Sequence, residues 1–149
     1  MLLKKIYNHI IKGSWEIKKL YLTAFFYMAY IRFCMFFVKY SWYESSMGKR
    51  GVGHDEIVLN ETNQLYIKKV RTVVQAVSKY TLWESKCMVQ ALSAKWLLQK
   101  YHIPSTIFFG VFKDTQENKL KAHAWLKIND FVITGAAGHQ KFKVVNFYS

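Results

Sequence analysis

The chain has 149 residues, of which 52% are hydrophobic and 17% are aromatic. This length and composition predict one folded domain with its own core, and they exclude an intrinsically disordered chain. Twenty-two Lys and Arg against nine Asp and Glu give a formal net charge of +13. Such a charge attracts an acidic peptide, a nucleic acid or an anionic membrane surface. Because the basic residues are scattered and form no nucleic-acid motif, we expect no nucleic-acid partner.

The N-terminal third is expected to be helical, over residues 2–12 and 15–41. Its most apolar stretch, 20–31, ends after about a dozen residues at Arg32, whereas a transmembrane helix needs about 20. A buried core helix is therefore favoured over a surface-lying or partner-docking helix, and both are favoured over a true span. The chain does not open on a signal-peptide pattern. We expect a cytoplasmic protein, with a peripheral position on the inner face of the membrane left open.

A loop is expected at residues 45–53, where three glycines and two serines occur. This break suggests an aromatic, basic helical region over residues 1–50 that packs on a core formed by residues 51–149. The two parts are expected to form one compact domain.

Two more helices and then a set of strands are expected after this loop. Apolar residues recur at spacings of three and four over 63–79 and 88–101, and the second helix is expected to begin at or just before Cys87. Alternating and β-branched segments then predict strands at 106–112, 122–128, 130–134 and 143–148. Helices followed by strands predict an α+β fold with an antiparallel sheet.

Cys87 and His123 are the residues that suggest chemistry. At the start of a helix, the first-turn amides, the helix dipole and the neighbouring Lys86 favour the thiolate form of Cys87. Taken alone, such a cysteine can also be a small core residue. His123 opens an alternating strand later in the chain, and a helix-start Cys followed by a strand-borne His allows the two to meet in space. We therefore interpret Cys87 as a nucleophile and His123 as its base.

Three segments, WESKCMVQAL, AHAWL and VITG, resemble the leader peptidases of lasso peptide biosynthesis, the B proteins, in their stand-alone C-terminal peptidase form. The resemblance runs from about residue 65 to the end. It implies a transglutaminase-like, papain-like cysteine protease core that removes the leader from a ribosomally made precursor peptide. It also implies a separate leader-recognition partner protein and a lasso cyclase as partners.

The third member of the catalytic group is where the chain departs from that family. The family commonly carries an Asp twelve residues after the His, and Gly135 stands at that position here. Asp130 is the nearest carboxylate, but a hairpin turn at 129–130 would place it about seven residues from His123, roughly 20 Å along the strand. A backbone carbonyl opposite His123, or the Thr134 hydroxyl, is the favoured group for orienting the imidazole.

Donors for the oxyanion are expected next to the nucleophile. The backbone amide of Cys87 is the first candidate, and the side chain of Gln90 or Trp83 is the second. The sequence contains no Cys-x-x-Cys or other zinc spacing and no glycine-rich phosphate loop, so neither a metal nor a cofactor is expected.

Two other functions are compatible with the same residues. A non-catalytic basic binding module could hold an acidic peptide or a membrane surface and use Cys87 only as a core residue. Alternatively, the same Cys-His pair could pass an acyl group to an amine instead of to water.

Overall fold

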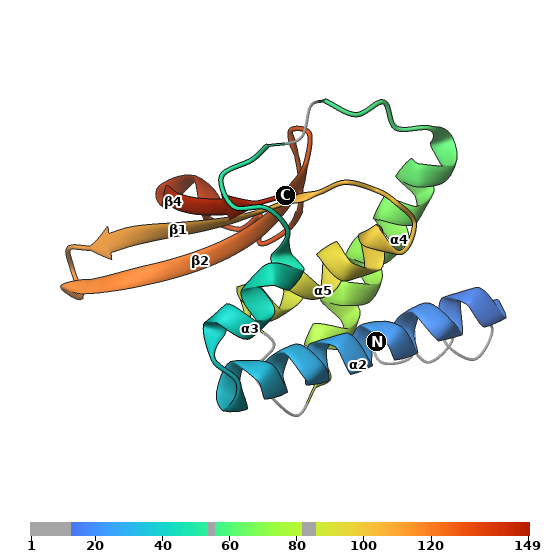
Figure 1. Cartoon of the computed structure of the whole chain (residues 1–149), viewed down its shortest axis with the longest axis horizontal. Helices are drawn as coiled ribbons and strands as arrows, with labels where there is room; N and C mark the ends of the chain where they lie inside the picture. The colour runs from blue at the N-terminus through green and yellow to red at the C-terminus, as the bar shows by residue number, and fades with distance from the viewer. Residues whose placement is uncertain (1–12, 54–55, 82–85) are drawn as a thin grey trace.

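The computed structural model describes residues 13–53, 56–81 and 86–149. Its helices come first and its strands afterwards, which confirms the predicted α+β fold (Figure 1). The helices are α2 (Trp15–Phe37), α3 (Tyr40–Glu44), α4 (Glu61–Ser78) and α5 (Cys87–Gln99). The strands are β1 (Thr106–Asp114), β2 (Lys119–Ile128), β3 (Phe131–Thr134) and β4 (Lys143–Tyr148). The predicted helix over 2–12 lies outside the described residues.

The four strands form one antiparallel sheet with the order β3-β2-β1-β4. Ile128 pairs with Phe131, so the β2–β3 turn consists of Asn129 and Asp130 alone, as predicted. Asn129 has a φ of 49°, and asparagine tolerates this left-handed conformation better than most residues. This tight turn fixes the register that sets β3 beside the His123 strand.

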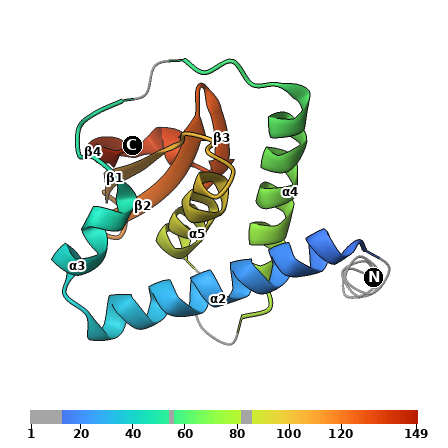
Figure 2. The same cartoon turned by 45° about the vertical axis from the view of Figure 1, so that its right-hand side comes forward.

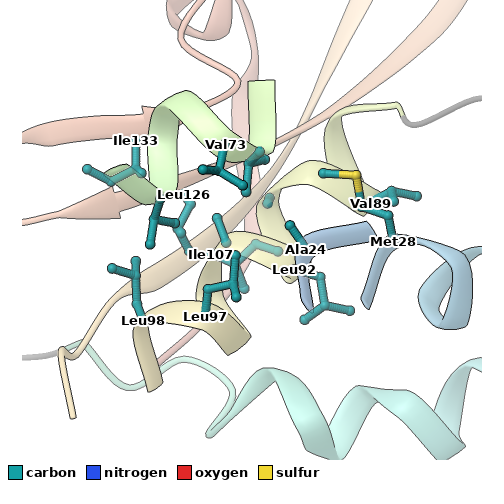
Figure 3. Close-up of a cluster of buried hydrophobic side chains, with 14 of the residues drawn as sticks. Ala24, Met28, Val73, Val89, Leu92, Leu97, Leu98, Ile107, Leu126 and Ile133 are labelled. Carbon is teal, nitrogen blue, oxygen red and sulfur yellow. The ribbon is translucent and has the colours of Figure 1, made fainter. Parts of the chain in front are cut away.

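The core lies between the sheet and α5, and α2 and α4 pack against α5 from outside (Figure 2). Figure 3 shows Leu97 and Leu98 of α5 beside Ile107 and Leu126 of the sheet, all fully buried. Residues alternate along a strand, so Leu126 points into this core while His123 points to the other face of β2. The helix that begins at Cys87 and the strand that carries His123 therefore belong to one packed unit.

The predicted helix over 15–41 is in fact two helices. α2 ends at Phe37, because Val38 has an extended backbone, and α3 begins at Tyr40. Val38 is β-branched, and such residues favour the extended conformation. The prediction of a buried helix holds for one face of α2 only, which packs on α4 and α5. The buried residues of this face are Leu20, Tyr21, Ala24, Met28, Ile31 and Cys34.

The glycine-rich segment 45–53, predicted as a loop, also forms backbone hydrogen bonds with the C-terminal strand. Lys49 and Ser149 exchange two backbone hydrogen bonds, and the Gly51 amide donates to the Phe147 carbonyl. Met47, just before this pairing, is fully buried. The segment after the N-terminal helices is thus fastened to the free edge of β4. The division into residues 1–50 and 51–149 stays a prediction.

Lys95 of α5 is a charged side chain in the core, with only 1% of its surface exposed. Its Nζ donates a hydrogen bond to the Ser105 carbonyl. Burial lowers the pKa of Lys95 to about 8, against 10.5 for an ordinary lysine. Between these two values the unfolded chain binds more protons than the folded chain. The free energy of unfolding should therefore rise with pH from about 8 to 10.5, and it should be lower below that window.

We expect Lys95→Met to remove this rise and to raise the free energy of unfolding at pH 7 by up to about 3 kcal/mol. The gain is reduced by about 1 kcal/mol because the Ser105 carbonyl loses its donor. Urea unfolding at several pH values between 7 and 10 measures both effects, with the exposed Lys100→Met as the matched control. A Lys95→Met variant that keeps the full pH dependence would contradict this account of the buried charge.

Candidate active site

Cys87 is the first residue of α5, as predicted, and its free thiol is partly exposed. Lys86 before it has an extended backbone and is the N-cap of the helix. The N-terminus of a helix favours negative charge, and Lys86 adds a positively charged residue next to Cys87 in the sequence. A partly exposed cysteine in such surroundings has the features of a reactive thiol.

His123 lies on β2 with its ring between two aromatic rings. Its centroid is 5.0 Å from that of Phe142 and 5.9 Å from that of Trp125. Its Nε2 is 2.8 Å from the carbonyl oxygen of Gly135. Because a carbonyl oxygen can only accept, Nε2 carries the proton and Nδ1 of the neutral ring is an acceptor. The imidazole is thus oriented in a tautomer that can take a proton at Nδ1.

α5, which begins at Cys87, packs against the face of β2 that carries Leu126, whereas the side chain of His123 lies on the other face of that strand. The two side chains are not joined by a hydrogen bond in the part of the chain that the structure describes. The Cys-His pair therefore stays a prediction.

The group that orients His123 is the backbone carbonyl of Gly135, which is one of the alternatives left open by the sequence. Asp130 is fully exposed in the β2–β3 turn, where its carboxylate lies 3.6 Å from Lys127 Nζ. Thr134 pairs with Leu126, and both are buried, so its side chain points to the core side of the sheet. In this structure neither Asp130 nor Thr134 forms a hydrogen bond to the imidazole.

A family model described as "Transglutaminase-like superfamily" matches residues 36–146, which is about three quarters of the chain. The chain belongs to the transglutaminase-like superfamily. Comparison with curated proteins and with solved structures found no match. The match begins within α2 and includes both Cys87 and His123.

Gly135 is a position that only glycine fits in this member of the superfamily. Its φ is 73°, and a Cβ placed there would lie 2.5 Å from the Ala124 carbonyl oxygen and 2.9 Å from Trp125 Cβ. This close approach of the backbones brings the Gly135 carbonyl to the imidazole. It also leaves no room for an aspartate side chain at the same position.

We expect Gly135→Ala to lower the free energy of unfolding by about 2–4 kcal/mol, because backbone strain and a backbone clash add. Gly138→Ala is the matched control, since Gly138 has a φ of 72° and a Cβ added there would meet no atom within 4 Å. The control should cost only the strain, about 1–2 kcal/mol. Denaturant unfolding of the two variants measures the difference, and equal losses would show that the contact with Ala124 is unimportant.

Of the two side chains predicted as oxyanion donors, the structure describes only Gln90. Gln90 is three residues after Cys87 on α5, so the two share one face of the helix. Trp83 lies outside the described residues. The described residues contain no group of three or more His, Cys, Asp or Glu side chains that could hold a metal ion.

Phe142 was not predicted as part of the site. It follows the short 3₁₀ turn His139–Lys141 and precedes β4, and it covers the ring of His123. The segment between β3 and β4 folds back across β2, and a local sequence pattern does not reveal such a return.

Proposed function

We propose that this chain is a cysteine peptidase that removes the leader from a ribosomally made lasso peptide precursor. The observation that carries the proposal is the His123 imidazole, held through Nε2 by the Gly135 carbonyl so that Nδ1 is an acceptor. Membership of the transglutaminase-like superfamily and a helix that begins at Cys87 support it. The segments WESKCMVQAL and AHAWL, which contain Cys87 and His123, resemble the leader peptidases of lasso peptide biosynthesis.

In the proposed reaction, Cys87 Sγ attacks the scissile carbonyl carbon and its proton passes to Nδ1 of His123. The Cys87 amide and the Gln90 side chain donate to the oxyanion. When the intermediate collapses, the C–N bond breaks and His123 returns the proton to the leaving amine. Water then attacks the thioester, again with His123 as base, and the carboxylic acid and the free thiol are released.

The proposed partners follow from the chemistry of the substrate. A chain with a net charge of +13 attracts acidic segments of a precursor peptide through long-range electrostatics. A separate leader-recognition protein would present the precursor, and a lasso cyclase would use the core peptide that is released. We propose a cytoplasmic location because the precursor is made there.

The test is mass spectrometry of a cognate precursor incubated with the full chain and its leader-recognition partner. Peptide hydrolysis predicts two products whose masses add up to the precursor plus one water. A product that contains an added amine in place of water would show acyl transfer instead. A precursor that binds but stays intact would overturn the peptidase and favour the non-catalytic binding module.

A further inference from the structure

α2 carries a row of apolar side chains on the face turned away from the core. We call this row the aromatic stripe, and its members are each 56–74% exposed. They are Trp15, Leu22, Phe26, Tyr30, Phe33 and Phe37. Most of the spacings between them are three or four residues, which places them along one side of the helix. Figures 1 and 2 both show α2 running along one edge of the molecule.

This arrangement is unusual for a helix on the surface of a globular domain. Such a helix carries polar residues opposite its buried face, and a helix that is apolar all round is normally covered on every side. Trp42 on the neighbouring α3 is 77% exposed and adds another large aromatic ring. Exposed apolar surface of this extent marks an interaction site.

The charges around the stripe indicate what covers it. Residues 13–50 contain six Lys and Arg and two Glu, a net charge of +4. Lys18 and Lys19 lie in the first turns of α2, and Lys39 follows its end. The Lys19 ammonium sits over the Trp15 ring, 5.6 Å from its centroid. Aromatic side chains beside cations are typical of helices that lie at the interface of an anionic bilayer.

The packing of α2 favours a helix that lies on the bilayer over one that crosses it. Its length and hydropathy would allow a span, but a third of the apolar window is buried in the protein. Ala24 and Met28 are fully buried and Ile31 is 1% exposed. A span would strip these side chains from α4 and α5 and would open the core.

We propose that the aromatic stripe binds the surface of an anionic lipid bilayer, with α2 lying in the plane of the interface. The stripe extends over about 33 Å at 1.5 Å per residue. A bilayer accepts aromatic rings anywhere along that length, whereas a protein partner needs a matching set of pockets. The positive charge likewise fits a broad anionic surface. This inference does not depend on the peptidase activity.

The experiment is sedimentation of the full chain with vesicles of phosphatidylcholine alone or mixed with phosphatidylglycerol. We expect binding to the mixed vesicles and at least about tenfold weaker binding to neutral ones. The double variant Phe33→Gln/Phe37→Gln should lose at least about tenfold in affinity for the mixed vesicles, because two rings no longer enter the interface. Circular dichroism checks that it is folded.

A matched control removes apolar surface elsewhere. Leu120→Gln/Phe131→Gln replaces two side chains on the sheet that are 71% and 70% exposed, and it should bind the mixed vesicles as the unaltered chain does. Lys18→Gln/Lys19→Gln should weaken this binding by about fivefold for each charge.

Three results would overturn the proposal. The first is no binding to either vesicle, and the second is equal binding to both. The third is binding that the folded Phe33→Gln/Phe37→Gln variant retains in full. A dimer that this variant disrupts, found without vesicle binding, would assign the stripe to a second copy of the chain instead.

Discussion

Cys87→Ala and Cys87→Ser are expected to abolish precursor cleavage, with losses of roughly 10⁴-fold or more in rate. The thiol is the nucleophile in the proposed reaction, and a serine hydroxyl at the same place is a far weaker one at neutral pH. The fold should survive, because Cys87 is a partly exposed residue at the end of a helix. Product formation followed by mass spectrometry and thermal unfolding measure the two expectations separately.

Cys34→Ala provides the matched control, since Cys34 is the other free cysteine and is only 5% exposed on α2. It should lower the unfolding temperature somewhat and leave cleavage intact. An alkylating reagent should modify Cys87 faster than Cys34 in the folded chain, because Cys87 is partly exposed and Cys34 is buried. Substantial cleavage by a folded Cys87→Ala variant would remove the thiol from the mechanism.

The strands and their turns were predictable because their signals are local. Alternation around His123 set the two faces of β2, and the Asn129-Asp130 pair set the turn. A two-residue turn fixes the register of a hairpin, so the sequence already placed the 134–136 region opposite His123. The structure narrows that region to one atom, the Gly135 carbonyl oxygen.

The features that the sequence missed depend on contacts between distant segments. The pairing of Lys49 with Ser149 at the edge of β4 joins residues a hundred positions apart, and no local pattern encodes it. The aromatic stripe could not be predicted from the sequence for a different reason. Because α2 is apolar on both sides, its periodicity does not separate the face that meets the core from the face that meets solvent.

The chemistry of the site was predictable only in part. Residue types and local patterns singled out Cys87 and His123 as candidates, since the start of α5 is visible in the sequence; the strand of His123 was predicted from residue 122, whereas β2 begins at Lys119. The orientation of the imidazole depends on how closely β3 approaches β2, and the glycine that permits this approach has no side chain to reveal its role. The covering ring of Phe142 comes from a segment whose path is set by the whole sheet.

His123→Ala is expected to lose cleavage as completely as Cys87→Ala, whereas Asp130→Ala should keep most of it. His123 is the group that takes and returns the proton, and its loss leaves the thiol without a base. Asp130 lies at the far end of β2, about seven residues or roughly 20 Å along the strand from His123. Its removal costs one solvent-exposed contact with Lys127, and such surface ion pairs contribute little to stability.

Values of kcat/KM for the two variants, measured on the same precursor with the same partner, test this assignment. Asp130→Ala is itself the matched control, because it removes a titratable side chain from the same hairpin without touching the imidazole. If a folded Asp130→Ala variant were as inactive as His123→Ala, the carboxylate would have to reach the imidazole. The pairing of Ile128 with Phe131, which places Asp130 in the turn, would then not be the active arrangement, and Asp130 would replace the Gly135 carbonyl as the orienting group.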